Sequence, residues 1–142
     1  MKYLVSIFIL LLLLSCSDLS SPEEVNTSMI KEILENIETA FNFADSEVIM
    51  SYYHPDFLHN GDNYQNEELR WQIRSIDYNE IMISDIEIEF FTDFSAIANF
   101  TLILKSINNE EEFSEPSNEN GDISYFHKES GEWKILGNQL EY

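Results

Sequence analysis

Two stretches in the second half of the chain decide the fold: EIMISDIEIEF at 80–90 and SAIANFTLILK at 95–105. In the first, isoleucines and a phenylalanine alternate with polar residues, and the alternation slips by one place at Ser84-Asp85, which predicts a β-bulge. In the second, one face is entirely apolar and the other is mixed; the apolar positions are Ala96, Ala98, Phe100, Leu102 and Leu104. This period of two, with one apolar face, predicts antiparallel strands in a curved sheet that is covered on one side.

The sequence before these strands has the period of helices. Ser21-Pro22-Glu23-Glu24 has the form of a capping box, so a helix is expected to begin at Pro22 or at Thr27. Its apolar residues recur at helical spacing and predict a core-facing stripe: Ile30, Ile33, Leu34, Ile37, Ala40 and Phe41. Asp45 is the expected N-cap of a second helix, which should end near His54 because Pro55 disfavours helical geometry in the residue before it.

A short strand and a third helix complete the first half. Phe57 to His59 is typical of a strand, and Asn60-Gly61-Asp62 of a turn. Asn66 is the expected N-cap of the third helix, over Glu67 to about Ile76. Its apolar positions are Leu69, Trp71, Ile73 and Ile76.

The last third of the chain is expected to contain one acidic loop and two strands. Residues 108–122 hold six acids and few apolar residues, which predicts a solvated loop or a mobile hairpin tip. Strands are expected at 123–128 and from 132 onward, joined by a turn at 129–131. The order of elements predicts an α+β domain over 22–142, with three N-terminal helices packed on a curved, mainly antiparallel sheet.

Composition excludes several classes of protein. The chain has 142 residues with 27 Asp and Glu against 7 Lys and Arg, and its formal net charge is −20. That charge repels phosphate backbones and anionic headgroups, so we expect neither nucleic-acid binding nor polybasic attachment to a membrane. The 44% hydrophobic and 13% aromatic residues are too many for a disordered acidic tail.

The N-terminus is typical of a secreted protein. An apolar run from Leu4 to Leu14 is broken only by Ser6, and its length, about 16 Å as a helix, is roughly half the bilayer core. We therefore expect a signal peptide over 1–15 rather than a membrane span.

The end of the apolar run, Leu13-Leu14-Ser15-Cys16, resembles the bacterial lipobox. The resemblance implies that Cys16 is lipidated, that residues 16–21 form a short tether, and that the protein is held in the cell envelope, at the outer membrane in a Gram-negative cell. The alternative is an ordinary signal peptide with an incidental thiol. Cys16 is the only cysteine, so it has no partner for a disulfide within the chain.

Three motifs resemble the nuclear transport factor 2-like superfamily, the cone-shaped fold that includes ketosteroid isomerases and polyketide cyclases. They are the segments 40–45 (AFNFAD), 52–61 (YYHPDFLHNG) and 126–135 (FHKESGEWKI). The resemblance implies a pocket between the curved sheet and the helices. With Asp45 as the common point, the isomerase's catalytic base falls on Gly61 and its oxyanion tyrosine falls on Ile37, and neither can perform that chemistry.

The candidate site residues follow from this comparison. The first candidate for acid–base work is His59, because imidazole titrates near neutrality and His59 shares a strand face with Phe57. The expected pocket residues are Tyr53, Phe57, His59, Trp71, Phe100 and Tyr125, and the alternative is that these side chains simply fill the core. His54, Asp56, His59 and Asp62 are close in sequence, but no periodicity brings them together, so no metal and no cofactor is expected.

These features predict a lipid-anchored, non-catalytic protein whose pocket binds a small apolar or amphipathic molecule or a protein partner. One alternative is a cyclase-, dehydratase- or isomerase-type enzyme that uses His59. Another is a module that forms homodimers through its sheet, where Ile97 and Ile103 lie on the mixed face of the strand.

Overall fold

Helices come first along the chain and the long strands follow, as the sequence predicts. The computed structural model describes residues 20–117 and 121–141. The helices are α2 (Pro22–Asn42), α3 (Ser46–Ser51) and α4 (Tyr64–Asp77), with a 3₁₀ turn at Gly121–Ile123. The strands are β1 (Leu58–His59), β2 (Asp62–Asn63), β3 (Glu80–Thr92), β4 (Ser95–Lys105), β5 (Glu110–Glu115), β6 (Tyr125–Glu129) and β7 (Glu132–Ile135).

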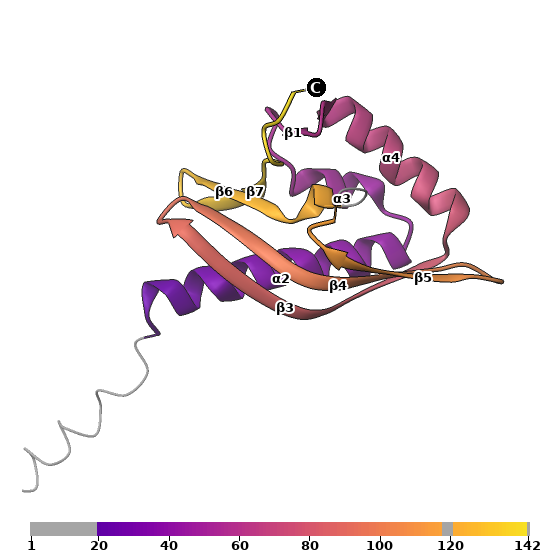
Figure 1. Cartoon of the computed structure of the whole chain (residues 1–142), viewed down its shortest axis with the longest axis horizontal. Helices are drawn as coiled ribbons and strands as arrows, with labels where there is room; N and C mark the ends of the chain where they lie inside the picture. The colour runs from indigo at the N-terminus through magenta and orange to yellow at the C-terminus, as the bar shows by residue number, and fades with distance from the viewer. Residues whose placement is uncertain (1–19, 118–120, 142) are drawn as a thin grey trace, which may run out of the picture.

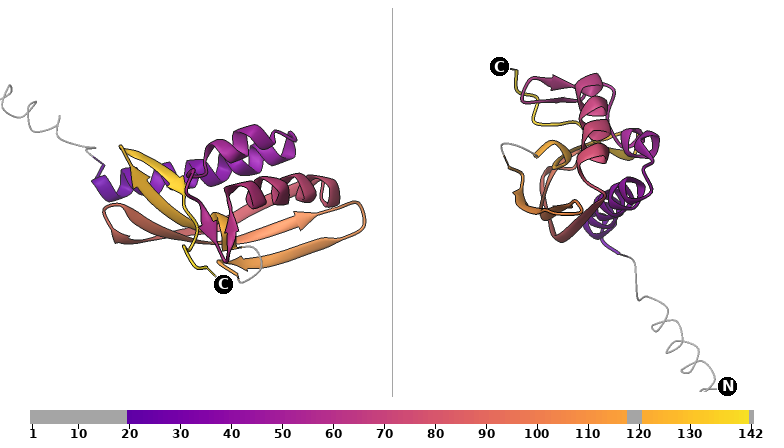
Figure 2. Two further views of the ribbon diagram at one scale, coloured as in Figure 1. Left: turned by 90° about the horizontal axis from the view of Figure 1, so that it is seen from above. Right: turned by 90° about the vertical axis from the view of Figure 1, so that its right-hand side faces the viewer.

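A five-stranded antiparallel sheet is built around β4. β3 pairs along one edge of β4, while β6 and β5 share the other edge, β6 beside Ser95 to Ile97 and β5 beside Phe100 to Lys105. The register shift after Ser84 and the positive φ of Asp85 (56°) confirm the predicted bulge. The helices gather on one face of the sheet, which curves around them (Figures 1 and 2). This is the predicted α+β architecture.

Helix α2 forms as its sequence predicts. The Ser21 hydroxyl accepts from the backbone N–H of Glu24 at 3.1 Å, and the Glu24 carboxylate accepts from the N–H of Ser21 at 2.7 Å, which confirms the capping box. All six residues of the predicted stripe are buried. Side chains near the end of α2 also cover the free edge of β3: Asn42 bonds both the N–H and the C=O of Ile81, and Glu38 accepts from the N–H of Ile83 at 2.7 Å.

The boundaries of the two later helices differ from the prediction. α3 begins after the predicted N-cap Asp45 but ends at Ser51, before His54, and the chain then runs beside β7 with the His54 N–H bonded to the carbonyl of Ile135 at 2.8 Å. α4 begins one turn earlier than predicted. Its N-cap is Asn63, whose side chain accepts from the N–H of Asn66 at 3.1 Å, so the prediction that Asn66 is the cap was wrong.

The prediction of a solvated loop or a mobile hairpin tip over 108–122 was wrong for residues 110–115 and for Asp122. Residues 110–115 form β5, in which alternate side chains turn towards the covered face of the sheet, and Glu115 is buried. Asp122 is fully buried in the 3₁₀ turn, and β6 starts at Tyr125 rather than at residue 123. Pairing with the preceding strand β4 places the acids of β5, and pairing with Arg74, 48 residues away in the sequence, places Asp122.

Residues 136–140 close the structure against the short β1–β2 hairpin. The N–H of Leu58 bonds the carbonyl of Leu136 at 3.1 Å, and the N–H of Gly61 bonds that of Leu140 at 2.9 Å. Gly137 has a φ of 78°, and a Cβ at this position would lie 2.2 Å from the carbonyl oxygen of Leu58. The absence of a side chain at Gly137 therefore allows this close approach.

Candidate functional site

Helix α4 turns a polar face towards the interior of the cone. Glu67, Trp71 and Arg74 are buried, with Glu67 at 0% and Arg74 at 6% exposure, and their spacing of four and three residues places them on one side of the helix. The residues expected from their apolar character to pack inward, apart from Trp71, lie on the other side: Leu69, Ile73 and Ile76 are 49–83% exposed. The buried face of α4 is therefore its polar face, which is the opposite of the arrangement expected for an amphipathic helix.

Arg74 and Asp122 form a buried, bidentate ion pair. The two guanidinium nitrogens Nη1 and Nη2 donate to the carboxylate oxygens of Asp122 at 2.9 and 3.1 Å. The guanidinium carbon also lies 4.6 Å from the centre of the Trp71 ring. Burial by itself would raise the pKa of Asp122, but the Arg74 charge outweighs it and the pKa falls to about 2. Asp122 is therefore ionised at neutral pH.

Glu67, a second carboxyl group of this cluster, has its pKa moved in the opposite direction. Its pKa is raised well above the ordinary value, first by burial and then by the neighbouring Asp122 charge. The Tyr53 hydroxyl donates to Oε1 of Glu67 at 3.3 Å and accepts from the Trp71 indole N–H at 2.8 Å. Two fully buried carboxyl groups whose pKa values are moved apart thus belong to one cluster.

A pocket of about 560 Å³ lies between α4 and the β4–β5 ladder, next to this cluster. Its lining is part apolar and part charged: Asp62, Asn66, Leu69, Arg70, Ile73, Arg74, Tyr78, Leu104, Glu111 and Phe113. Arg70 forms an ion pair with Asp62, and its Nε lies 3.5 Å from Oε2 of Glu67. Tyr78 donates to Glu111 at 2.9 Å. Arg74 belongs both to the pocket lining and to the buried cluster, so the two are continuous.

The structure places most of the predicted pocket residues in the hydrophobic core. Tyr53, Phe57, Trp71 and Phe100 are 1–4% exposed, and Tyr125 is partly exposed. Among the described lining residues of the α4 pocket, none of the six predicted residues occurs; Tyr53 lines a separate hollow of about 500 Å³ with Met50, Pro55 and Tyr64. Ligand binding by the predicted set stays a prediction.

His59, the predicted acid–base candidate, is buried at 4% exposure. Its ring centre lies 6.5 Å from that of Phe57, stacked, and 5.6 Å from that of Tyr125. Nδ1 accepts from the backbone N–H of Asn138 at 3.3 Å. Burial, the largest effect, lowers the pKa of His59, so the ring is neutral at pH 7.

The four residues considered as metal ligands do not form a cluster. His54 lies beside Asp56, with Nδ1 4.0 Å from Oδ2, and contacts Glu129 through Nε2 at 3.0 Å, whereas Asp62 pairs with Arg70 and His59 bonds Asn138. Within residues 20–117 and 121–141, no group of three or more His, Cys, Asp or Glu side chains is placed to hold a metal ion. The two positions compared with the isomerase are likewise structural, since Ile37 is fully buried and Gly61 lies in the β1–β2 turn with a φ of 83°.

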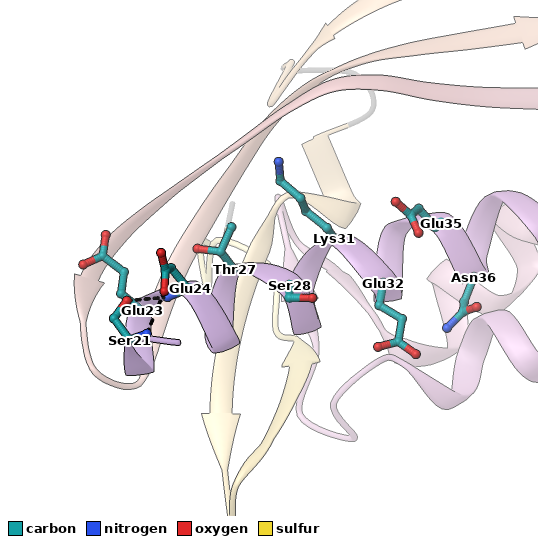
Figure 3. Close-up of a pocket in the computed structure, with 9 residues that line it drawn as sticks. All are labelled: Ser21, Glu23, Glu24, Thr27, Ser28, Lys31, Glu32, Glu35 and Asn36. Carbon is teal, nitrogen blue, oxygen red and sulfur yellow. Dashed lines mark hydrogen bonds between the residues drawn. The ribbon is translucent and has the colours of Figure 1, made fainter. Parts of the chain in front are cut away.

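A larger hollow, of about 980 Å³, follows the outer face of α2 from Ser21 to Asn36. Figure 3 shows that its side chains, including Glu24, Lys31 and Glu35, all project from one helix. The face of a single helix is convex and provides no opposite wall. The α4 pocket, which lies between a helix and a sheet, is therefore the better candidate site.

Four charged residues of the site were not predicted from the sequence: Glu67, Arg70, Arg74 and Asp122. A signal was present in α4, because Glu67, Arg70, Trp71 and Arg74 recur at i, i+3, i+4 and i+7, the spacing of one helix face. Asp122 offered only a weak signal, as the last acid of an acidic segment directly before apolar Ile123.

Comparisons with known proteins define the fold. No protein-family model matches the chain, and neither does any curated protein. Solved structures do match. A putative scytalone dehydratase from Novosphingobium aromaticivorans aligns with a TM-score of 0.62 at 11% identity, covering 82% of this chain and 83% of that one. An NTF-2 like protein of unknown function from Shewanella oneidensis aligns with a TM-score of 0.61 at 16% identity, covering 79% and 95%.

A third match is a putative calcium/calmodulin-dependent protein kinase II association domain from Xanthomonas campestris, with a TM-score of 0.56 at 13% identity, covering 76% of this chain and 81% of that one. These matches and the cone of helices on a curved sheet define the class: this is an α+β protein with a nuclear transport factor 2-like fold. Identities this low show the fold alone, and the function must be argued from the site.

Proposed function

We propose that this chain is a lipid-anchored protein of the cell envelope that binds a small amphipathic molecule in the α4 pocket, without catalysis. The observation that carries the proposal is the lining of that pocket, about 560 Å³ in volume, which combines apolar and charged side chains. Cavities of this size and mixed character are typical of small-molecule sites.

The lining favours a particular ligand chemistry. Leu69, Ile73, Leu104 and Phe113 offer contact to an apolar body. Elsewhere in the lining, Arg70 is paired with Asp62 and Tyr78 with Glu111, so the charged groups already have partners. A polar but uncharged or zwitterionic head group would add hydrogen bonds there without leaving a buried charge unpaired.

Native mass spectrometry tests the binding proposal. A co-purifying small molecule is expected on the wild-type protein. Leu69→Asp, at a position 56% exposed, should remove it because the new carboxylate lies among the apolar lining residues. Ile107→Asp, at a position 93% exposed in the β4–β5 turn, is the matched control and should retain it. Equal occupancy in the two variants, or no bound molecule on the wild type, would contradict the proposal. The same spectra report whether the protein is a homodimer.

The anchor is proposed from the lipobox-like sequence at Cys16, which lies outside the residues that the structure describes. In the part that it does describe, no helix has the length and apolar character needed to cross a bilayer. Cys16→Ser should abolish incorporation of a labelled fatty acid, because serine offers no thiol to the lipid transferase. Labelling of this variant at the wild-type level would contradict lipidation at Cys16.

An acid–base enzyme is the second candidate. The observation that favours it is the pair of buried carboxyl groups whose pKa values are moved apart, Glu67 upward and Asp122 downward. Because Glu67 is fully buried, a substrate would have to enter past Arg70 and Arg74 to reach it. Turnover of the co-purified molecule, lost in Glu67→Gln while occupancy is kept, would favour the enzyme over the binding protein.

A further inference from the structure

Two phenylalanines are exposed at the end of the molecule where the described chain begins. Phe91 is 61% exposed and Phe94 is 59% exposed, at the tip of the β3–β4 hairpin. Phe91 lies at the register shift between Phe90 and Thr92, and Phe94 lies in the turn before β4. Phe90, in contrast, turns inward, with its ring centre 5.9 Å from that of Trp133. The two exposed rings therefore contribute little to the core.

The hairpin tip lies beside the N-terminus of α2. A hollow of about 740 Å³ is lined by Ser21 to Glu23 and Asn26 on one side and by residues 88–93 on the other. Lys128 links the two elements, since its backbone N–H bonds the carbonyl of Phe94 at 2.9 Å and its Nζ donates to Asn26 at 2.8 Å. Figure 1 and the left view of Figure 2 show the tip and the start of α2 at the same end of the molecule, with β5 towards the other end.

The tether between Cys16 and Ser21 is short enough to hold this end of the molecule near a membrane. The argument rests on the proposed lipidation of Cys16. Five residue steps separate Cys16 from Ser21, and an extended chain covers them in at most about 18 Å. A lipid held in the bilayer at Cys16 would keep the start of α2 within that distance of the membrane surface, and the hairpin tip lies across one hollow from that start. So short a tether raises the local concentration of lipid seen by the tip, and weak contacts become sufficient.

We propose that Phe91 and Phe94 insert into the boundary between headgroups and acyl chains of the bilayer that holds the anchor, and so orient the domain with its α4 pocket facing away from the membrane. Apolar rings gain free energy at this boundary. The exposed acids Glu23, Glu89 and Asp93 flank the tip and would repel anionic headgroups. The surface therefore fits zwitterionic or uncharged lipid rather than anionic lipid.

A tryptophan at the tip tests this insertion. The lipidated protein carrying Phe94→Trp is reconstituted into phosphatidylcholine vesicles with and without brominated acyl chains. The two native tryptophans, Trp71 and Trp133, are 1% and 2% exposed and give a constant background. We expect a blue-shifted emission and quenching by the brominated lipid, both weakened when half of the lipid is phosphatidylglycerol. Ile107→Trp, in the turn at the opposite end of β4, is the matched control and should show neither effect.

The outcomes separate this inference from the anchor on which it rests. Intact mass of the same sample reports whether Cys16 carries lipid. If it does not, lipidation is wrong, and the thiol of Cys16 is instead coupled to a maleimide phospholipid, which restores the same tether. In either form of attachment, Phe94→Trp emission and quenching equal to those of Ile107→Trp would overturn the insertion.

Discussion

The two long helices of this domain bury opposite kinds of surface. α2 buries six apolar residues, each at most 8% exposed, and leaves its charged residues on the outside. α4 buries Glu67, Arg74 and Trp71 and exposes Leu69, Ile73 and Ile76. Both helices pack on the same side of one sheet (Figure 2), so the difference lies in their partners.

The comparison shows that a polar helix face can be buried where the facing residues supply partners for its polar groups. α2 faces the apolar side chains of the core, where only hydrophobic contacts offset the loss of water. α4 faces Asp122 and Tyr53, which pair with Arg74 and Glu67. Burying charges costs several kcal/mol per ion unless each has a partner of good geometry. Removing one partner of a buried pair in α4 should therefore destabilise the fold more than removing both partners.

The largest expected effect is that of breaking one buried pair. Arg74→Ala should lower the free energy of unfolding by about 3 to 5 kcal/mol, because Asp122 would stay buried after losing the guanidinium that pairs with it. Denaturant unfolding measures it. Arg74→Met combined with Asp122→Leu should recover most of the loss, since both charges are gone. A double variant as unstable as Arg74→Ala would mean that the cost is one of packing rather than charge.

An effect of similar size is expected in the core covered by α2. Trp133→Ala should destabilise the domain by about 3 to 5 kcal/mol, because the ring is 2% exposed and packs on Phe90 while its N–H donates to Asn26 at 3.1 Å. No recovery by a second substitution is expected here, in contrast to the pair in α4. A change in denaturant midpoint equivalent to less than about 1 kcal/mol would mean that the final hairpin is loosely packed.

A smaller effect should appear in the pH dependence of stability. In the unfolded chain Glu67 releases its proton near pH 4, whereas burial and the Asp122 charge raise its pKa in the folded state. The folded state thus binds more protons above pH 4, and stability falls as the pH rises from there towards the raised pKa. Glu67→Gln removes this dependence. Its stability relative to wild type should increase from pH 5 to pH 8, as measured by urea unfolding; a constant difference would show that Glu67 is already ionised.

The smallest effect on stability is expected from matched isoleucine-to-valine substitutions on the two helices. Ile37→Val on α2 should cost about 0.5 to 1.5 kcal/mol because the residue is fully buried, whereas Ile76→Val on α4, at 83% exposure, should stay within about 0.5 kcal/mol of wild type. Equal losses at both positions would mean that Ile76 is covered in solution, for example by a second copy of the chain.

The contrast also explains how far the sequence predicts the structure. The stripe of α2, the alternation of β4 and the bulge near Asp85 follow from local period and capping, and the structure confirms them. The site depends on a contact between Arg74 and Asp122, 48 residues apart, which no local pattern encodes. For the same reason the acidic segment that ends at Asp122 was interpreted as a solvated loop. Buried charge is visible in a sequence only when both partners are known.

The contact between residues 136–140 and the β1–β2 hairpin determines when this hairpin can complete its hydrogen bonds during synthesis. Leu58 and Gly61 find hydrogen-bond partners in Leu136 and Leu140, and His59 finds one in Asn138. During synthesis, residues 58–61 leave the ribosome long before these partners do. The hairpin and the ring of His59 therefore lack these hydrogen-bond partners until residues 136–140 have been made.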